Sequence, residues 1–345
     1  MSPARATAVE EAEWGAHMAQ AVGLALSPDF ESGGNPRVGC VIVDADGTVV
    51  GNGHHRGAGT PHAEVVALDD AGDRARGATA VVTLEPCRHT GRTGPCTQAL
   101  IEAGIARVVY AVADPGEESG SGARVLSDAG VEIVAGVGED DARWAARAWL
   151  HVREHGRPLV TLKSAVSLDG RVAAAGGGPT AITGPAARAW AHEWRSRVDA
   201  IAVGTGTVLA DDPALTARTP DGGLCPHQPI RVVVGQRPVP AGARVLDDAA
   251  ETVVFAGHDL GDLLRALAAR GVQHLLVEGG PTLEAAFLEA GLADEILWFV
   301  APVILGDGPV ALPALGAMVD VTVRRTLVMG EDVVVEGVLD VHRDR

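Results

Sequence analysis

Apolar and polar residues follow one another along the first half of this chain in patterns that predict helices and strands. Apolar side chains return every three or four positions over residues 12–26, which predicts an amphipathic helix. Short apolar runs at 40–43, 80–84 and 108–112 are bounded by turn residues, which is typical of strands. A second long helical pattern covers 140–153. Strands that alternate with helices predict a mixed or parallel sheet with helices on both faces.

The segment Gly156-Arg157-Pro158 separates two halves of the chain. A glycine that ends a helix and a proline that cannot continue one precede a new strand-like run at 159–163. Because 345 residues are many for one core, we predict two α/β domains, at 1–155 and 158–345. Further strands are predicted at 200–203, 230–234, 252–255, 274–277 and 295–300, with helices at 186–197, 260–270 and 282–290.

The composition of the chain limits which cellular compartment and which classes of partner we expect. Hydrophobic residues make up 47% of the chain, but no apolar run is long enough to span a bilayer, so we expect no membrane segment. The first residues lack an apolar stretch after their single arginine, so we expect no signal peptide and a cytoplasmic protein. A net charge of −17 and 3% aromatic residues argue against a nucleic-acid partner, although a local basic patch could hold one phosphate.

A metal-binding pattern begins at Pro61-His62-Ala63-Glu64 and continues in Glu85-Pro86-Cys87 and Gly94-Pro95-Cys96. One imidazole and two thiolates suit Zn²⁺ and leave a fourth tetrahedral position open for water. Glu64 is then free to move protons. This combination is typical of a zinc deaminase, in which a glutamate that is not a ligand transfers protons during attack on a ring carbon that bears an amine.

The spacing of these residues leaves an alternative open. His62 and Glu64 would diverge by roughly 200° inside a helix, so we expect a helix to begin beside them. Eight residues separate Cys87 from Cys96, so the generic Cys-x-x-Cys signature matches only in part. The alternative is a structural zinc site, or buried cysteines beside a surface histidine; a structural site would need a fourth ligand, and none is adjacent. Cys40 and Cys225 remain as a pair that a disulfide could join but need not.

These motifs carry a family resemblance that covers roughly residues 12–340. The first half resembles the deaminase half of the bifunctional riboflavin-biosynthesis deaminase–reductases. The resemblance lies in His62-Ala63-Glu64-Val65, Thr83-Leu84-Glu85-Pro86-Cys87, Gly91-Arg92-Thr93 and Pro95-Cys96. The second half resembles their reductase half in Lys163, 167–171, 207–218, 277–283 and Ala301-Pro302.

The resemblance implies a cytidine-deaminase-like three-layer α/β/α domain followed by a dihydrofolate-reductase-like α/β domain. It implies a pyrimidine ribotide substrate, a diaminopyrimidine carrying ribose phosphate, that is deaminated to a uracil and then reduced by NADPH at ribosyl C1′. It also implies a homo-oligomer, a dimer or tetramer. Zinc falls on His62, Cys87 and Cys96 and the proton shuttle on Glu64, and the pyrimidine pocket is implied at Asn35, His55 and His89.

The resemblance assigns the reductase residues as well. Catalytic positions match Lys163, Asp211 and Glu278. Contacts to NADP match Ala165, Thr207, Asp211, Gln236, Gly280, Pro281 and Thr282, and contacts to substrate match Arg195, Leu215, Arg218 and Glu278.

Read from the residues alone, the reductase positions leave alternatives. No Gly-x-Gly-x-x-Gly fingerprint opens a helix, so a Rossmann site is not supported. The run 278–282 between a strand and a helix suits phosphate, or is a plain turn. Lys163 ends a predicted strand as a phosphate or carbonyl partner, or faces solvent. The Asp211-Asp212-Pro213 turn could place one buried carboxylate near nicotinamide to relay a proton, or be only a capped turn. Arg195 and Arg218 could hold phosphate, or be ordinary surface charges.

The chain departs from the family pattern at several positions. Pro179 and Ala181 stand where a serine and a tryptophan are usual, which removes a hydroxyl and an aromatic wall beside the cofactor. Gly235 ends the strand at 230–234 in place of a polar residue and leaves Gln236 and Arg237 to meet the 2′-phosphate of NADP. One alternative function is therefore an active deaminase with a weakly reducing, nucleotide-binding second half. A base deaminase on nucleic acid and a non-enzymatic zinc-stabilised module are the others.

Overall fold

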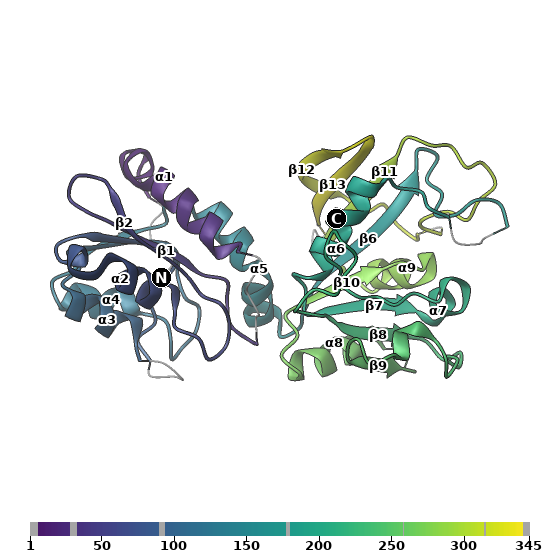
Figure 1. Cartoon of the computed structure of the whole chain (residues 1–345), viewed down its shortest axis with the longest axis horizontal. Coiled ribbons are helices and arrows are strands. Elements are labelled where there is room, and N and C mark those ends of the chain that lie inside the picture. The colour runs from purple at the N-terminus through teal and green to yellow at the C-terminus, as the bar shows by residue number, and fades with distance from the viewer. Residues whose placement is uncertain are drawn as a thin grey trace. The chain divides into compact units, whose positions relative to one another are not determined.

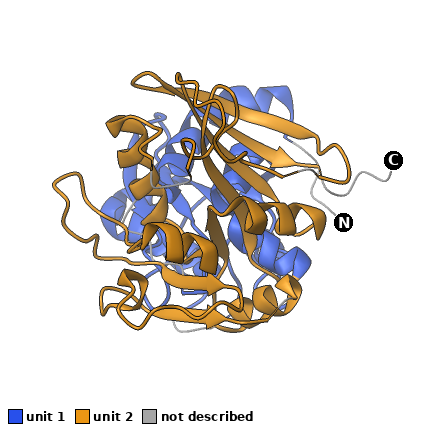
Figure 2. Cartoon of the chain, turned by 90° about the vertical axis from the view of Figure 1, so that its right-hand side faces the viewer, with its two compact units in different colours: residues 1–155 blue, residues 156–345 orange. Residues whose placement is uncertain are grey.

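The computed structural model describes residues 6–27, 33–89, 94–176, 180–257, 259–313 and 315–340. The chain forms two compact units that divide between His155 and Gly156, and Figure 2 distinguishes them by colour. Each unit has its own sheet and its own hydrophobic core. None of the helices in the described ranges has the length and apolar character needed to cross a membrane.

Unit 1 is built on a five-stranded mixed sheet with the order β2-β1-β3-β4-β5. Figure 1 labels β1 and β2 of this sheet. β1 pairs antiparallel with β2 and β3, whereas β3, β4 and β5 run parallel. The strands are β1 Gly39–Val43, β2 Val49–His54, β3 Thr79–Leu84, β4 Arg107–Val112 and β5 Glu132–Ala135. Every residue of β1 and β3 is buried, as expected for central strands that are covered on both faces.

Helices pack on both faces of this sheet. α1 contacts β1, β3 and α5, whereas α2 contacts β1, β2 and α3. The helices are α1 Ala8–Ala25, α2 Ala63–Ala71, α3 Cys96–Ala103, α4 Gly122–Asp128 and α5 Glu139–His155, with a 3₁₀ turn, η1, at Gly72–Ala75. α1 begins four residues before the predicted start because Thr7 and Glu10 form a capping box, which satisfies the free amides of the first turn.

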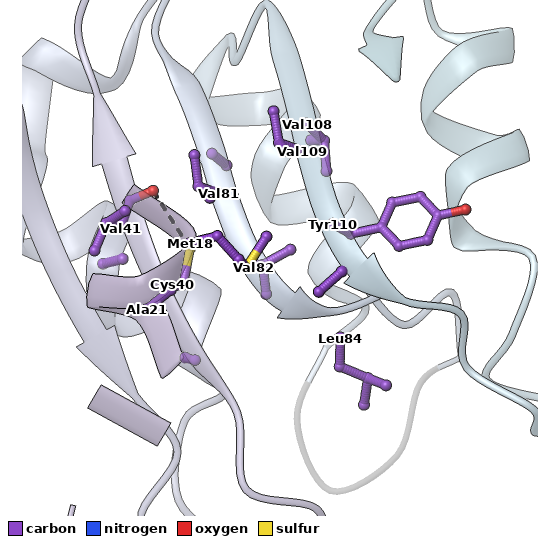
Figure 3. Packing of buried hydrophobic residues seen from close by; sticks show 14 of the residues in the cluster. Met18, Ala21, Cys40, Val41, Val81, Val82, Leu84, Val108, Val109 and Tyr110 are labelled. Carbon is purple, nitrogen blue, oxygen red and sulfur yellow. Dashed lines mark hydrogen bonds between the residues drawn. The ribbon is translucent and has the colours of Figure 1, made fainter. Parts of the chain in front are cut away.

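The core of unit 1 joins α1 to the middle of the sheet (Figure 3). Met18 and Ala21 of α1 belong to one buried cluster with Cys40 of β1 and Val82 of β3. Burying a side chain the size of Met18 contributes about 1.5–3 kcal/mol. The cluster therefore anchors the sheet edge from which the metal-binding segments extend.

A glycine in β2 lets α2 lie directly on the sheet. A Cβ built on Gly53 would stand 2.1 Å from the carbonyl oxygen of Ala63, the first residue of α2. Such a contact is impossible, so any side chain at Gly53 would push the start of α2 outward. His62 and Glu64 flank Ala63, so this close approach fixes their position.

Unit 2 is built on an eight-stranded sheet with the order β12-β13-β11-β6-β10-β7-β8-β9. The six strands from β11 to β9 run parallel, and the β12–β13 hairpin adds antiparallel strands beside β11. The strands are β6 Leu159–Ser167, β7 Ala200–Gly204, β8 Ile230–Val234, β9 Thr252–Phe255, β10 His274–Glu278, β11 Glu295–Ala301, β12 Val321–Met329 and β13 Asp332–Leu339. The helices are α6 Pro185–Arg195, α7 Thr205–Asp211, α8 Leu260–Ala269 and α9 Pro281–Glu289, with a 3₁₀ turn, η2, at Arg244–Leu246.

Three features of unit 2 differ from the sequence prediction. β6 continues to Ser167, so Lys163 lies within the strand and does not end it. β12 and β13 were not predicted, since β12 is almost wholly exposed and lacks a clear apolar alternation. α7 was not predicted either, because Thr205, Gly206 and Thr207 are poor helix formers. Its start is fixed by its place at the carboxyl end of β7.

Candidate active sites

Three ligands for a metal meet where two helices of unit 1 begin. His62 is the N-cap of α2, Cys96 is the first residue of α3, and Cys87 lies just after β3. Nδ1 of His62 lies 3.1 Å from Sγ of Cys96 and 3.6 Å from Sγ of Cys87. Their ligand atoms all lie within 4.8 Å of one another.

This geometry fits zinc. Tetrahedral bonds of about 2.0 Å to nitrogen and 2.3 Å to sulfur hold such ligand atoms about 3.5 Å apart. Within the described part of the chain, no fourth His, Cys, Asp or Glu joins the three ligands. A site with three protein ligands and an open position is typical of catalytic zinc, so the donor set favours catalysis over a structural role.

Neighbouring groups shift the pKa values of the two cysteine thiols in opposite directions. The amide of Cys96 donates to Sγ of Cys87 at 3.4 Å. The hydrogen bond from the Cys96 side chain, and next that from His62, lower the pKa of Cys87 to about 4. Cys87 in turn raises the pKa of Cys96 well above its usual value. One proton therefore remains on the pair, and a metal that binds both sulfurs must displace it.

Glu64 lies beside this cluster and is not part of it. Its side chain is buried in the first turn of α2, where burial raises its pKa and His62 partly opposes that effect. A cavity of about 370 Å³ is lined by Glu64, His62 and Cys87 together. The carboxyl group thus faces the same space as the metal ligands, with a raised affinity for protons.

The predicted pyrimidine-pocket residues line the same cavity. Nδ2 of Asn35 lies 2.8 Å from Nε2 of His55, and Nδ1 of His55 lies 3.0 Å from the carbonyl oxygen of Pro61. Burial lowers the pKa of His55, so its ring is neutral at physiological pH. Nδ1 of His89 is buried and has no hydrogen-bond partner within the described residues. Thr90 and the Gly91-Arg92-Thr93 motif lie outside the described residues.

Two contributions to this cavity were missed by sequence reasoning. Trp149 and Arg153 reach it from α5, whose helical pattern carries no sign of a site. Glu85 is buried, and its two carboxylate oxygens accept hydrogen bonds from the amides of Asp114 and Ala123. Glu85 therefore braces the segment that carries Cys87, a role that only the tertiary structure reveals.

Unit 2 contains a larger cavity, of about 1080 Å³, at the carboxyl ends of its parallel strands. This is the edge at which open parallel sheets bind ligands. Gln236, Arg195, Leu215 and Arg218 do not line it within the described residues. The predicted site residues that do are Lys163, Ala165, Thr207, Asp211, Glu278, Gly280, Pro281 and Thr282.

Glu278 holds two cations at the end of β10. Its oxygens accept hydrogen bonds of 2.7 Å from Nε and Nη2 of Arg195, and Nζ of Lys163 lies 3.7 Å away. Burial alone would raise the pKa of Glu278, but Arg195 and Lys163 outweigh it and lower that pKa to about 2. Lys163 also lies 5.1 Å from the ring centre of Phe299. The predicted solvent-facing alternative for Lys163 is therefore wrong.

The glycine loop and α9 form a cradle for an anion. Gly279 and Gly280 have φ angles of 85° and 87°, which favour glycine, and Pro281 begins α9 directly after them. Gly280, Pro281 and Thr282 at this helix start line the cavity, and the start of a helix favours an anion. α7 begins in the same way after β7, which neighbours β10 in the sheet. The cavity therefore has room and two helix starts for the phosphates of a dinucleotide.

The residues predicted to contact substrate, other than Glu278, lie outside the described lining of this cavity. Arg195 is engaged with Glu278 and with the carbonyl oxygen of Thr216, at 3.2 Å. Arg218 donates to the carbonyl oxygen of Gly222. Leu215 is buried with a φ of 52°. Of the two residues expected at the 2′-phosphate, Arg237 lines the cavity, and a Cβ on Gly206 would approach its guanidinium to 2.6 Å.

The Asp211-Asp212-Pro213 turn holds no buried carboxylate, since both aspartates are exposed. Asp211 is exposed at the end of α7, so a buried role there is wrong. Glu284 in the first turn of α9 is only 1% exposed and lines the same cavity. Its oxygens accept hydrogen bonds of 3.1 and 2.8 Å from Oγ of Ser164. Sequence reasoning missed it because an acidic residue in the first turn of a helix is ordinary.

Both units match known protein families. Residues 12–112 match the cytidine and deoxycytidylate deaminase zinc-binding region, and residues 158–335 match the RibD C-terminal domain. The riboflavin biosynthesis protein RibD of Mycobacterium tuberculosis is 53% identical over 296 residues, which cover 84% of this chain and 86% of that protein. The chain belongs to the RibD family. RibD of Escherichia coli is 41% identical over 340 residues, covering 88% of this chain and 92% of its own.

Solved structures agree with this family membership. RibD of Acinetobacter baumannii superposes with a TM-score of 0.86 at 35% identity, covering 96% of this chain and 99% of its own. A deaminase/reductase of Thermotoga maritima gives 0.86 at 33% identity, covering 95% and 99%. The predicted family and two-domain α/β class are confirmed. This RibD protein is a bifunctional enzyme of riboflavin biosynthesis, a deaminase that uses Zn²⁺ and a reductase that uses NADPH.

Proposed function

We propose that the substrate is a diaminopyrimidine that carries ribose 5-phosphate. Residues 1–155 deaminate its ring to a uracil, and residues 158–345 reduce its ribosyl group to ribityl at C1′. The name of the Thermotoga maritima relative supports this choice, because it describes a diaminohydroxyphosphoribosylaminopyrimidine deaminase and a 5-amino-6-(5-phosphoribosylamino)uracil reductase. The observation that carries the deaminase half is the buried Glu64 beside a three-ligand cluster, two of whose members, His62 and Cys87, line the same cavity as Glu64.

In the deaminase cavity, His62, Cys87 and Cys96 hold zinc. Zinc, when bound, polarises a water molecule and lowers its pKa toward neutrality. Glu64 accepts a proton from the attacking water and delivers it toward the amine, which leaves as ammonia while the ring carbon gains a carbonyl oxygen. Burial supports this role, since it raises the pKa of Glu64 and so lets the carboxyl group carry a proton.

Asn35, His55 and His89 hold the pyrimidine. Asn35 and His55 are joined by a 2.8 Å contact, so they act on the ring as one preorganised pair. The buried Nδ1 of His89, which lacks a partner within the described residues, supports a hydrogen bond from that nitrogen to the substrate.

In the reductase cavity, NADPH would supply a hydride to C1′ of the ribosyl group, while the bond between C1′ and the ring oxygen opens and that oxygen takes up a proton from water. Gly280, Pro281 and Thr282 bind its phosphates through the start of α9, and Thr207 acts at the start of α7. Ala165 and Asp211 line the space beside them. Gln236 stays a predicted contact, and Arg237 next to it supports recognition of the 2′-phosphate, because it lines the cavity.

Lys163 and Glu278 orient the sugar of the substrate. They form one charged group at the cavity wall, with Arg195 behind Glu278. Leu215 and Arg218 stay predicted substrate contacts outside the described lining.

The experiment that tests both halves follows ammonia and NADPH separately. Purified zinc-loaded protein is incubated with the diaminopyrimidine ribotide, with and without NADPH. We expect ammonia in both samples and oxidation of NADPH only after deamination. Ammonia without any NADPH oxidation would instead support the deaminase with a degenerate second unit. No ammonia would refute the proposed substrate.

Two further properties belong to this proposal. We infer a homo-oligomer, a dimer or tetramer, because the β12–β13 hairpin exposes the apolar side chains of Val321, Val323, Val328, Val333 and Val338. Sedimentation equilibrium tests it, and a monomer at micromolar concentration would refute it. We also infer a cytoplasmic location, which the four free cysteines support, Cys40 and Cys225 included.

A further inference from the structure

The cavity of unit 2 contains two buried glutamates with opposite surroundings. Glu278 is paired with Arg195 and lies near Lys163. Glu284 has no ion-pair partner within the described residues, although it is only 1% exposed. The hydroxyl of Ser164 donates to its carboxyl oxygens at 2.8 and 3.1 Å. Burial without an ion-pair partner favours the neutral acid.

Glu284 connects two segments that enclose the proposed cofactor site. Its side chain contacts Ser164 in β6, and its amide donates to the carbonyl oxygen of Gly280 at 3.1 Å. The amide of Leu283 donates to the same oxygen at 2.8 Å. Glu284 therefore ties the glycine loop and the start of α9 to the central strand β6.

The charges that face Glu284 come from two strands. Lys163 of β6 favours the ionised carboxylate, whereas Glu278 of β10 opposes it. Burial is the largest effect and raises the pKa of Glu284 to about 8, although hydrogen bonds from Ser164 and Gly279 oppose it. At neutral pH the group is a neutral acid, and above about pH 8 it becomes a second buried negative charge behind the glycine loop.

We propose that Glu284 is a positioning residue for NADPH, which holds the glycine loop as a neutral carboxylic acid and weakens cofactor binding when it loses its proton. The reason is electrostatic: the phosphates of the cofactor lie at the start of α9, and an ionised Glu284 in the same turn repels them. This inference rests on the proposed placement of NADPH in the unit 2 cavity.

The test is the dissociation constant of NADPH between pH 6.5 and 9.5, measured on the zinc-loaded full chain by the fluorescence of the reduced cofactor. We expect it to rise above about pH 8, with about tenfold per pH unit as the upper limit that loss of one proton sets. Glu284→Gln resembles the neutral acid, so its dissociation constant stays near the neutral-pH value of the wild type and loses this rise. Glu251→Gln, a change of an exposed glutamate, is the matched control and keeps the wild-type pH dependence.

The outcomes separate this inference from the proposed cofactor site. A wild-type dissociation constant that is unchanged between pH 7 and 9, or a Glu284→Gln variant with the wild-type slope, overturns the inference. If the wild type binds no NADPH at any pH, the placement of the cofactor fails instead.

A second measurement uses the wild type alone, in case the variant does not fold. Calorimetric titration with NADPH at pH 8.5, in buffers with different heats of ionisation, should show net uptake of up to about three quarters of a proton per cofactor, the share of Glu284 that is ionised at this pH. Binding without any proton uptake would overturn the inference.

Discussion

The guanidinium of Arg195 donates two hydrogen bonds of 2.7 Å to the carboxylate of Glu278, which is only 7% exposed. The first residue ends α6 and the second ends β10, so the contact connects a helix to the edge of the sheet. A two-point contact of this kind fixes the direction of the carboxylate as well as its charge. The arginine expected to bind phosphate is thus already engaged with a protein side chain.

Removal of this arginine should destabilise unit 2. Arg195→Ala leaves Glu278 buried with only Lys163 nearby, and loss of one partner of a buried pair costs about 3–5 kcal/mol. We expect an unfolding transition that moves to lower urea concentration, loss of NADPH oxidation and unchanged release of ammonia. Arg188→Ala, on the exposed side of the same helix, is the control. Equal stability of the Arg195 variant and the wild type would show that the pair is not important for folding.

Glu278 also predicts how stability changes in acid. Its pKa is about 2 in the folded protein, below the ordinary value of 4.5. Because the folded pKa is lowered, the stabilisation is present above about pH 4.5 and is lost as the pH falls toward 2. The loss is on the order of 3 kcal/mol. Urea unfolding at several pH values should show it in the wild type, and Glu278→Gln should lack this component; an identical acid dependence of both proteins would contradict it.

Glu64→Gln should stop deamination without loss of the metal. The amide keeps the shape of the side chain but cannot carry a proton, so we expect the rate of ammonia release to fall by about 10²–10⁴. Zinc content should stay at one per chain, because Glu64 lies outside the ligand cluster. Asp69→Asn, an exposed position on the same helix, serves as the control. Full activity of the Glu64 variant would disprove the assigned role.

Loss of a metal ligand should separate the two activities. Cys87→Ser removes one thiolate, so we expect zinc content and ammonia release to drop together. The deaminated intermediate should still be reduced, because all residues that line the second cavity belong to unit 2. Cys225→Ser removes a cysteine outside the cluster and should keep full zinc content. A Cys87 variant with normal zinc content would contradict the ligand assignment.

Arg237 should set the preference for NADPH over NADH. A charge-assisted hydrogen bond to the 2′-phosphate is worth about 1.5–3 kcal/mol, so Arg237→Gln should raise the KM for NADPH by about tenfold or more. The KM for NADH should not change, since NADH lacks that phosphate. Arg265→Gln, an exposed arginine of α8, is the control. An equal rise for both cofactors would assign Arg237 to a general role in the cavity.

The pattern of apolar residues along the chain predicted most helices and strands, but it did not predict those with a weak pattern. Central strands such as β1 and β3 are fully buried, so their apolar runs are unbroken and easy to recognise. β12 is nearly all exposed and α7 consists partly of poor helix formers, so neither had a pattern to detect. β12 is placed by its hairpin pairing with β13, and α7 by the carboxyl end of β7 that it directly follows.

The metal site could be predicted because its ligands are residue types that can be recognised in the sequence. One histidine, two cysteines and a free glutamate favour a zinc deaminase over a structural zinc site before any coordinates are known. The tertiary structure alone decided which carboxyl groups of unit 2 are buried and which are paired. The sequence around Asp211 and Glu284 does not show which of the two carboxyl groups is buried. Asp211 is exposed at the end of α7, whereas Glu284 is buried in the first turn of α9, where its side chain contacts Ser164 of β6. Burial and pairing depend on segments brought together by folding, and a pattern along one chain does not contain those distances.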